Sequence, residues 1–252
     1  YLTWEVSFLR IDNTRAPLDD RRVRLALNYA VDREGMRGTI LSKDVVHATQ
    51  MVTPGVPGHN HELDKNIRPY DPAKAKQLLA EAKAAGVPVD KEILLISYPE
   101  NFPNAGELME AYLAMLKAVG LNMKLMTVEA GQYASWNSKP YPNPRPPYVL
   151  QSSHDNLSGD PVFSVNPKYG CSGGSSGYCD PEFDKQVTAV SVLGGQERAA
   201  GWSRLFRTIY EDLVPDVMLY HMIGYTRVGK RINFKPDVTT NNEVRFQEIT
   251  FK

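Results

Sequence analysis

The sequence predicts an α/β fold, with one sheet of mixed strand directions and helices on its faces. Residues 17–33 carry apolar side chains at the 3.6-residue period of a helix. An apolar run at 93–98, a helical pattern at 108–119 and an alternating pattern at 121–129 follow one another as strand, helix and strand. This order favours a βαβ unit, in which a right-handed crossover joins two parallel strands.

Length and composition are those of an ordinary globular protein. The 252 residues are enough for one large domain or two small ones. Lys and Arg together number 29, as do Asp and Glu, so no net charge attracts nucleic acid or anionic lipid. No apolar run approaches the roughly 18 residues of a membrane-spanning helix. Tyr1 opens directly on strand-like sequence, without a signal peptide.

The first predicted helix has an apolar and a polar side. The apolar stripe is formed by Val23, Ala26, Leu27 and Ala30, and the polar side by Arg21, Arg22, Arg24 and Asn28. Asp19 or Asp20 can cap the first helical amides, and Asp32 is placed to cap a second short helix. By its period alone, this segment is an amphipathic core helix.

Strands and capped helices make up the rest of the chain. Residues 4–11 are rich in β-branched and aromatic side chains, which favours a strand. Asp-Pro pairs at 71–72 and 180–181 are typical of helix starts, because Asp caps the helix and Pro fits its first position. The further predicted elements are helices at 132–138 and 197–213, strands at 148–151 and 215–221, and loops at 42–69 and 140–147.

The segment 13–33 resembles a sequence phrase of the family 5 extracellular solute-binding proteins, the dipeptide, oligopeptide and nickel receptors of bacterial ABC importers. The matching residues are Asn13, Pro17, Asp19, Val23, Arg24, Ala26, Tyr29, Ala30, Asp32 and Arg33. Residues 70–82 match a second phrase of the family, and the strand at 121–129 matches a third. The proline cluster at 140–147 departs from the family, which usually has a short turn there.

The resemblance implies a periplasmic-binding-protein-like lobe from the C-terminal half of such a receptor. Residues 1–13 would cross from the other lobe, residues 14–215 would form the ligand-binding lobe, and residues 216–252 would return. The chain would then be mature or truncated, which accounts for the missing leader. The protein would be periplasmic, or extracellular and tethered to the membrane.

The implied function is that of the substrate-binding component of an ABC importer. The protein would capture a small polar ligand between two lobes, with a short peptide favoured, and deliver it to the permease. It would catalyse no reaction, need no cofactor and act as a monomer. It would bind no nucleic acid and meet the membrane only through the permease.

The resemblance also implies a ligand contact at Asp155. In peptide receptors of the family, an aspartate a few residues before a Gly-Asp-Pro accepts the α-ammonium group of the ligand. Asp155 has this place before the Gly-Asp-Pro at 159–161. A carboxylate in a closing cleft of low dielectric binds ammonium better than in water. The alternative is that Asp155 and Asp160 are turn residues.

Three further side chains are candidates for ligand contact. His154 is the neighbour of Asp155, and Trp136 offers a large aromatic surface near a loop. Arg145 stands alone among prolines beside the strand at 148–151, where it can meet a carboxylate. Other aromatic candidates for the cleft wall are Tyr141, Tyr148, Tyr220 and Tyr225.

Cys171 and Cys179 enclose a loop of Ser, Gly and Tyr. Two cysteines without another soft ligand make a poor structural zinc site, which takes four ligands. A disulfide closing this loop fits an oxidising compartment, and two free thiols are the alternative. Gly173 and Gly174 are not followed by the Gly-Lys-Ser/Thr of a phosphate-binding loop. They are interpreted as a flexible part of the segment between the cysteines.

Other functions remain as alternatives. Ser153, His154 and Asp155 are adjacent, but the members of a hydrolase triad meet through the fold, and no Gly-x-Ser-x-Gly motif is present. An α/β hydrolytic enzyme is nevertheless the main alternative to a binding protein. A second alternative is an adaptor lobe that binds only protein. Within the receptor family, the ligand can instead be an opine, a sugar or a nickel chelate.

The pair His59 and His61 raises the question of a metal site. Both side chains can lie on one side of an extended loop, but no acid or thiol stands at a companion spacing. A solvated loop is therefore the favoured interpretation, and no metal site is expected.

Overall fold

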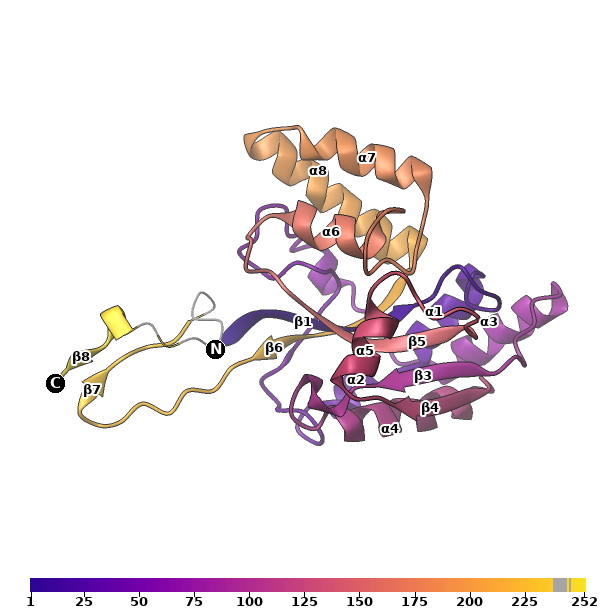
Figure 1. Ribbon diagram of the computed structural model, residues 1–252, viewed down its shortest axis with the longest axis horizontal. Coiled ribbons are helices and arrows are strands. Elements are labelled where there is room, and N and C mark those ends of the chain that lie inside the picture. The colour runs from indigo at the N-terminus through magenta and orange to yellow at the C-terminus, as the bar shows by residue number, and fades with distance from the viewer. Residues whose placement is uncertain (238–243, 245) are drawn as a thin grey trace.

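The computed structural model describes residues 1–237, 244 and 246–252 and shows a three-layer α/β lobe from which a C-terminal segment extends (Figure 1). The six strands of the main sheet lie in the order β2-β6-β1-β5-β3-β4. They are β1 (Leu2–Ile11), β2 (Val46–His47), β3 (Ile93–Ser97), β4 (Met123–Thr127), β5 (Tyr148–Asp155) and β6 (Asp216–Ile223). β7 (Ile232–Asn233) pairs with β8 (Thr250–Phe251) in the extended segment. The predicted α/β fold with a mixed sheet is confirmed.

Strand directions bring several strand ends to one edge of the sheet. β3 is parallel to β4 and β5, whereas β1 is antiparallel to β5 and β6. As a consequence, β3, β4, β5 and β6 end, and β1 begins, at the same edge, which we call the carboxyl rim. The chain enters and leaves the sheet at this rim (Figure 1).

Helices cover both faces of the sheet. On one face lie α1 (Arg21–Ala30), α3 (Pro72–Ala84) and α4 (Ala105–Ala118). On the other lie α5 (Ala130–Asn137), α6 (Pro161–Tyr169), α7 (Pro181–Ser191) and α8 (Gly195–Arg207), which a π-helical turn, η3 (Thr208–Leu213), extends. Short elements are α2 (Arg33–Met36), η1 (Leu63–Lys65), η2 (Pro99–Asn101) and η5 (Phe246–Glu248). None of the described helices has the length and hydrophobicity needed to cross a membrane.

Most predicted helix starts are confirmed by their caps. The side chain of Asp20 accepts from the amide of Arg22 at 2.8 Å, and that of Asp71 from the amide of Lys74 at 2.8 Å. Asp180 likewise caps α7. Each carboxylate satisfies an amide at the positive end of the helix dipole.

The polar side of α1 is partly buried, because Arg24 and Asn28 on this side are enclosed by neighbouring parts of the chain. Arg24 is 7% exposed and Asn28 is fully buried. Arg24 donates to the carbonyls of Leu213 and Val214, each at 2.9 Å, and Asn28 donates to the carbonyl of Asp216 at 3.0 Å. The helix is therefore bonded to the chain just before β6.

Arg33 continues these contacts beyond the end of α1. Its Nε donates to the carbonyl of Met218 at 2.7 Å, and its Nη2 donates to Oδ1 of Asn28 at 3.1 Å. Arg24, Asn28 and Arg33 thus form one buried row, which we call the polar seam. The seam joins the segment 21–33 to the start of β6.

The region after the proline cluster differs from the prediction. β5 runs to Asp155 and does not end at residue 151, so His154 and Asp155 belong to a strand. The side chain of Asp160 caps α6, an unpredicted helix, by accepting from the amide of Val162 at 3.0 Å. Asp160 also forms an ion pair with Arg198 at 2.9 Å. It is therefore both a helix cap and an ion-pair partner, and not a simple turn residue.

The predicted division into segments 1–13, 14–215 and 216–252 stays a prediction. β1 and β6 lie side by side in the middle of the sheet. Both flanking segments therefore contribute a strand to the lobe.

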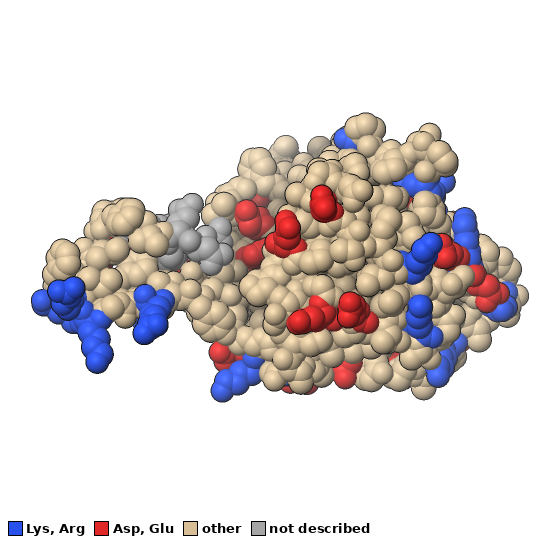
Figure 2. All heavy atoms as spheres, turned by 60° about the horizontal axis from the view of Figure 1, so that its bottom comes forward, with Lys and Arg blue, Asp and Glu red and all other residues tan. Residues whose placement is uncertain are grey.

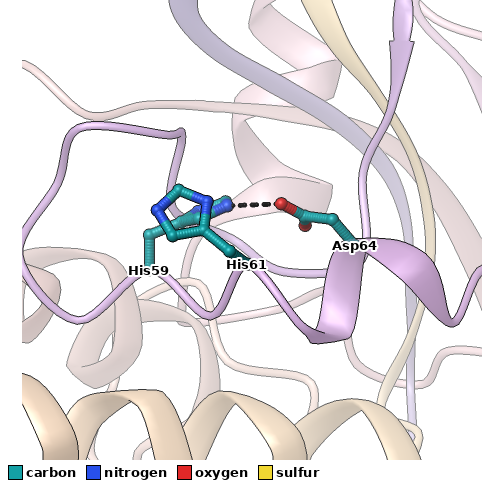
Figure 3. A group of neighbouring side chains, drawn as sticks. All are labelled: His59, His61 and Asp64. Carbon is teal, nitrogen blue, oxygen red and sulfur yellow. Dashed lines mark hydrogen bonds and ion pairs between the residues drawn. The ribbon is translucent and has the colours of Figure 1, made fainter.

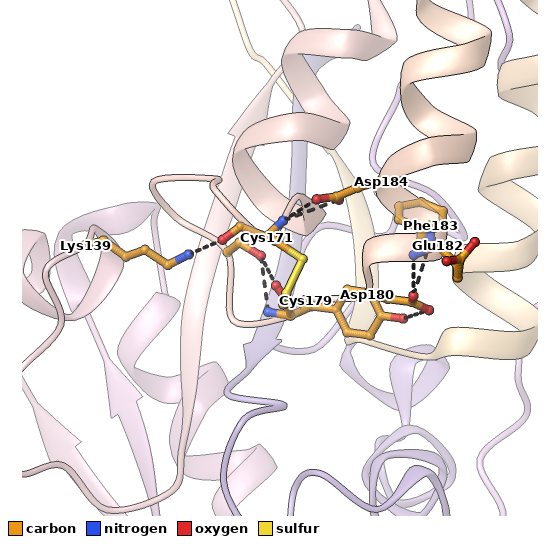
Figure 4. Close-up of a disulfide and its surroundings, with 9 residues drawn as sticks. Lys139, Cys171, Cys179, Asp180, Glu182, Phe183 and Asp184 are labelled. Atoms are coloured by element: carbon orange, nitrogen blue, oxygen red, sulfur yellow. Dashed lines mark hydrogen bonds between the residues drawn. A yellow bond between two sulfur atoms is a disulfide. The ribbon is translucent and has the colours of Figure 1, made fainter.

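The predicted disulfide between Cys171 and Cys179 is present, with the two sulfurs 2.09 Å apart. Figure 4 shows its surroundings between α6 and α7. The amide of Cys171 donates to the carboxylate of Asp184 on α7 at 3.1 Å, and Lys139 donates to the carbonyl of Cys171 at 2.9 Å. Gly173 is not a flexible spacer, because a Cβ at this position would lie 2.3 Å from the carbonyl oxygen of Asn166. The close approach of the two backbone segments therefore requires glycine here.

Replacing Arg24 with Ala should lower the free energy of unfolding by about 2–4 kcal/mol, because the buried carbonyls to which Arg24 donates would lose their hydrogen-bond donor. Urea denaturation of the full-length protein measures this loss. The matched control is Arg21→Ala in the same helix, because exposed Arg21 also donates to carbonyls, those of Asp212 and Glu211. We expect its effect to stay below about 1 kcal/mol. Equal losses in both variants would contradict a special role for the seam.

Replacing both Cys171 and Cys179 with Ser should lower the free energy of unfolding by about 2–3 kcal/mol, because the short loop is no longer closed in the unfolded chain. Denaturant unfolding under oxidising conditions measures the loss. Thiol titration of the denatured, unreduced wild-type protein should find neither cysteine reactive. Two reactive thiols would show that the bond does not form.

Candidate functional site

Two carboxylates lie opposite each other at the carboxyl rim. Asp155 is the last residue of β5, and Glu5 is its partner across the antiparallel ladder in β1. Side chains paired in this way have Cβ atoms about 4.5–5.5 Å apart. Asp155 is predicted from the sequence and Glu5 is not, because only the strand register shows that the two are neighbours. We call Glu5 and Asp155 the acidic pair.

The two carboxylates differ in their surroundings. Burial raises the pKa of Glu5 above its ordinary value of 4.5, Ser153 acts in the opposite direction by hydrogen bonding, and the charge of Asp155 raises it further. Asp155 is exposed, and its Oδ1 accepts from the amide of Leu157 at 3.0 Å. A positive group placed between them would relieve the repulsion and favour both charges.

Polar side chains from neighbouring strand ends lie on the same side of the sheet. Ser153 Oγ donates to Asn101 Oδ1 at 3.3 Å, and Gln151 Oε1 accepts from the amide of Tyr98 at 2.8 Å. The side-chain nitrogens of Asn101 and Gln151 are buried and have no partner among the described residues. Both can donate to an acceptor that enters from the rim.

A groove of about 450 Å³ lies at the rim beyond the ends of β3 and β4. It is lined by Pro99, Glu100, Thr127, Val128, Glu129 and Gln132. Crevices at the carboxyl ends of parallel strands are common ligand sites in open α/β sheets. In Figure 2, acidic side chains gather over the middle of one face, and Lys and Arg lie towards the two ends.

His154 is turned away from Asp155, because successive side chains of a strand point to opposite faces. Its Nε2 lies 2.9 Å from Ser164 Oγ on α6, and this hydroxyl donates to Asn156 Oδ1 at 3.1 Å. Burial lowers the pKa of His154 to about 4, and the charge of Lys168 contributes. The neutral ring therefore joins β5 to α6. Ser153, His154 and Asp155 do not form a triad in this arrangement.

Trp136 and Arg145 lie near the other end of β5. The ring of Trp136 packs edge-on against that of Tyr148, with the centroids 5.1 Å apart. Arg145 Nε lies 2.9 Å from Oδ2 of the buried Asp12. The strand from Tyr148 to Asp155 is roughly 23 Å long at about 3.3 Å per residue. The structure thus brings Glu5 to Asp155, and places Trp136 and Arg145 far from both.

The other aromatic candidates are dispersed. Tyr148 and Tyr220 are fully buried, so neither offers a cleft wall. Tyr141 donates to the carbonyl of Ser176 at 2.9 Å beside Arg145. Tyr225 is 73% exposed and lies just beyond the end of β6.

The interpretation of His59 as part of a solvated loop is wrong. His59 is buried, its Nδ1 lies 3.0 Å from the carbonyl oxygen of Val52, and its Nε2 lies 2.7 Å from Asp64 Oδ2. The turn η1 brings Asp64 back to His59 as the acidic partner that the sequence spacing did not indicate. His61 is exposed, and its ring lies beside that of His59 with the centroids 4.8 Å apart (Figure 3).

Comparison with known proteins supports the fold and the resemblance. The sequence model described as the middle region of bacterial extracellular solute-binding proteins of family 5 matches residues 1–176. The dipeptide-binding protein of Pseudomonas aeruginosa is 26% identical over 239 residues, which cover 91% of this chain and 43% of that protein. The heme-binding protein A of Haemophilus influenzae is 28% identical over 232 residues, which cover 90% of this chain and 41% of that protein.

Among solved structures, HbpA2 from Haemophilus parasuis is similar to this chain with a TM-score of 0.80 at 20% sequence identity. The match covers 100% of this chain and 49% of HbpA2. The predicted periplasmic-binding-protein-like fold is thereby confirmed. This chain spans less than half the length of these three proteins.

Replacing Glu5 with Gln should stabilise the ligand-free protein at neutral pH. A carboxyl group whose pKa is raised by folding contributes stability below its unfolded value, and this contribution is lost as the pH rises through the folded value. Gln carries no charge, so the variant avoids that loss. Thermal unfolding should show a higher midpoint for Glu5→Gln at neutral pH.

The difference should disappear as the pH falls below 4.5, the ordinary value for Glu, because the wild-type side chain is then also neutral. Glu100→Gln, at an exposed glutamate near the same rim, is the control and should show no such gain. A lower midpoint for Glu5→Gln at neutral pH would contradict the unfavourable charge at Glu5.

Proposed function

Because this chain belongs to the family 5 bacterial extracellular solute-binding proteins, we propose that it is one lobe of the substrate-binding component of an ABC importer. The lobe captures a small polar ligand, a short peptide, at its carboxyl rim. A second lobe of the same protein closes over the ligand from the other side. Two relatives are named a dipeptide-binding protein and a heme-binding protein, and the first of these supports the choice of a peptide.

The acidic pair is the observation that carries this proposal. Glu5 and Asp155 face each other at the rim where the chain enters and leaves the lobe. The α-ammonium group of a peptide can donate a hydrogen bond to each of the two carboxylates, and hydrogen bonds between charged partners are about twice as strong as neutral ones. Closure of a second lobe lowers the local dielectric, which strengthens the attraction further.

Neighbouring polar groups suit the rest of a peptide. The unpartnered side-chain nitrogens of Asn101 and Gln151 can donate to its carbonyl groups. The groove beyond β3 and β4 offers space for a side chain. His154 supports the site indirectly, because its contact with Ser164 holds the end of β5 against α6.

The other predicted ligand residues take structural roles in this proposal. A dipeptide or tripeptide extends about 7–11 Å at 3.3–3.6 Å per residue. A peptide of this length held at Asp155 does not reach Arg145, whose guanidinium already pairs with Asp12. Trp136 packs on Tyr148 at the same distant end. The ligand's carboxylate is therefore bound by groups other than Arg145.

The remaining features of the proposal follow from the class of protein. The receptor acts outside the cytoplasm, where the disulfide between Cys171 and Cys179 persists. It catalyses no reaction and passes its ligand to a membrane permease. It binds as a monomer and requires no cofactor or nucleic acid.

Asp155→Asn should weaken the binding of a dipeptide by at least about a hundredfold, or roughly 2.7 kcal/mol. The substitution keeps the shape and leaves the ammonium group without its charge partner, a loss that is costly in a closed site. Calorimetry on the full-length protein measures it. Asp90→Asn is the control, because exposed Asp90 pairs with Lys83 at the opposite end of β3. Asp160→Asn is a poorer control, since Asp160 caps α6.

An N-acetylated dipeptide separates the charge contact from other effects. Acetylation removes the ammonium charge, so it should weaken binding to the wild-type protein and have little further effect on Asp155→Asn. Additive losses from acetylation and substitution would mean that Asp155 does not contact the ammonium group. Normal dipeptide affinity in Asp155→Asn would rule out the proposed site.

A further inference from the structure

Four of the five histidines lie around one corner of the lobe, next to the edge strand β2. His47 belongs to β2 and His221 to β6, and residues 46 and 47 pair with 221 and 220. His59 and His61 come from the loop that follows β2. This corner is separate from the acidic pair, because His221 is paired with Val6 and therefore lies on the face opposite to Glu5.

Three side chains of the loop converge on one point. Single ligand atoms of His59, His61 and Asp64 all lie within 4.8 Å of one another. Figure 3 shows the His59 ring directed at the carboxylate of Asp64, with the His61 ring beside it. His59 Nε2 and Asp64 Oδ2 are 2.7 Å apart, so a proton now lies between two potential metal ligands.

The surroundings hold these two ligands as a metal site requires. Nδ1 of His59 donates to the carbonyl of Val52 at 3.0 Å, which leaves Nε2 to face the cluster. Asp64 Oδ1 accepts from Thr49 Oγ1 at 2.9 Å and from Gln50 Nε2 at 3.1 Å, so that Oδ2 is the oxygen that faces His59. Metal-binding histidines and carboxylates characteristically have such outer hydrogen bonds, which fix their orientation.

His221 supplies an independent observation. It is 1% exposed, and neither of its ring nitrogens has a hydrogen-bond partner among the described residues. Its ring centroid lies 6.2 Å from that of His59. With metal–nitrogen distances of about 2.0–2.1 Å, two imidazoles on one ion have centroids roughly 5–6 Å apart, so the His221 ring has to move slightly closer to His59 to share an ion with it. A buried imidazole without a partner is costly, and a metal ion would satisfy it.

A pocket gives access to this corner. It has a volume of about 470 Å³, and its lining includes Asp64, His221, His47 and Glu34. His47 Nε2 lies 3.2 Å from Glu34 Oε2, so these two side chains already pair with each other at the pocket wall. Exposed His61 stands at the solvent side of the cluster.

We propose that His59, His61, Asp64 and His221 bind a divalent transition-metal ion of the Zn²⁺ or Ni²⁺ class. Imidazole nitrogen with one carboxylate oxygen suits these ions, whereas Ca²⁺ and Mg²⁺ require mainly oxygen ligands. Binding releases the proton between His59 and Asp64 and joins the loop 48–64 to β6. The site is distinct from the acidic pair and does not depend on the ligand bound there.

Metal titration of the full-length protein tests the proposal. The protein is stripped with a chelator and titrated by calorimetry with zinc sulfate or nickel chloride at neutral pH. We expect one equivalent to bind with a dissociation constant of about 1 μM or tighter, that is, about −8 kcal/mol. His61→Ala and Asp64→Asn should each weaken binding at least tenfold. Glu62→Gln is the matched control, because exposed Glu62 lies on the same turn and pairs with Lys65. It should bind like the wild-type protein.

X-ray absorption at the metal edge identifies the ligands independently of affinity. Three imidazoles should be found in the wild-type protein and two in His61→Ala, an exposed position whose change should leave the fold intact. Circular dichroism of each variant verifies folding. Absence of saturable binding, unchanged affinity in either His61→Ala or Asp64→Asn, or fewer than three imidazoles in the wild-type protein would overturn the proposal.

Discussion

The polar seam fixes the strand on which the rest of the lobe depends. Just before β6 the chain leaves η3 through Val214, whose φ of +50° is rare for a β-branched residue. The carbonyls around this turn are buried and must be bonded. Arg24 and Asn28 donate to them from α1, and Arg33 donates to Met218 further along β6. The first helix thereby sets the position of β6, and β6 sets that of β1 and, through it, β5.

Local patterns were enough to predict most elements. Caps and periodicity identified α1, α3 and α7, and the strand–helix–strand order identified the parallel pair β3 and β4. Periodicity also separated the two sides of α1, but it does not tell what covers each side. The burial of Arg24 and Asn28 could therefore not be predicted, because it results from their hydrogen bonds to the end of η3 and to β6. Helix α6 was missed because its Gly-Asp-Pro start is equally typical of a turn and Pro167 interrupts its pattern.

The candidate sites depended on information that a sequence contains only indirectly. Asp155 was identified from its place before Gly-Asp-Pro, which is local. Glu5 becomes its neighbour only through the register of β1 against β5. Asp64 joins His59 because η1 reverses the chain, and a search for familiar ligand spacings does not detect such a turn. Arg145 looked unpaired because its partner, Asp12, is distant in sequence.

The two proposed sites lie on neighbouring strands but on opposite faces of the sheet. In β1, Val6 pairs with His154 on one side and His221 on the other, whereas the preceding Glu5 pairs with Asp155. Because side chains alternate along a strand, the acidic pair lies on one face of the sheet and His221 on the other. Each site nevertheless has one member on the central strands, Glu5 on β1 and His221 on β6, and these two strands pair with each other. A change in the course of these two strands at the rim would therefore displace Glu5 and His221 together, whereas the polar seam holds the opposite end of β6 in place.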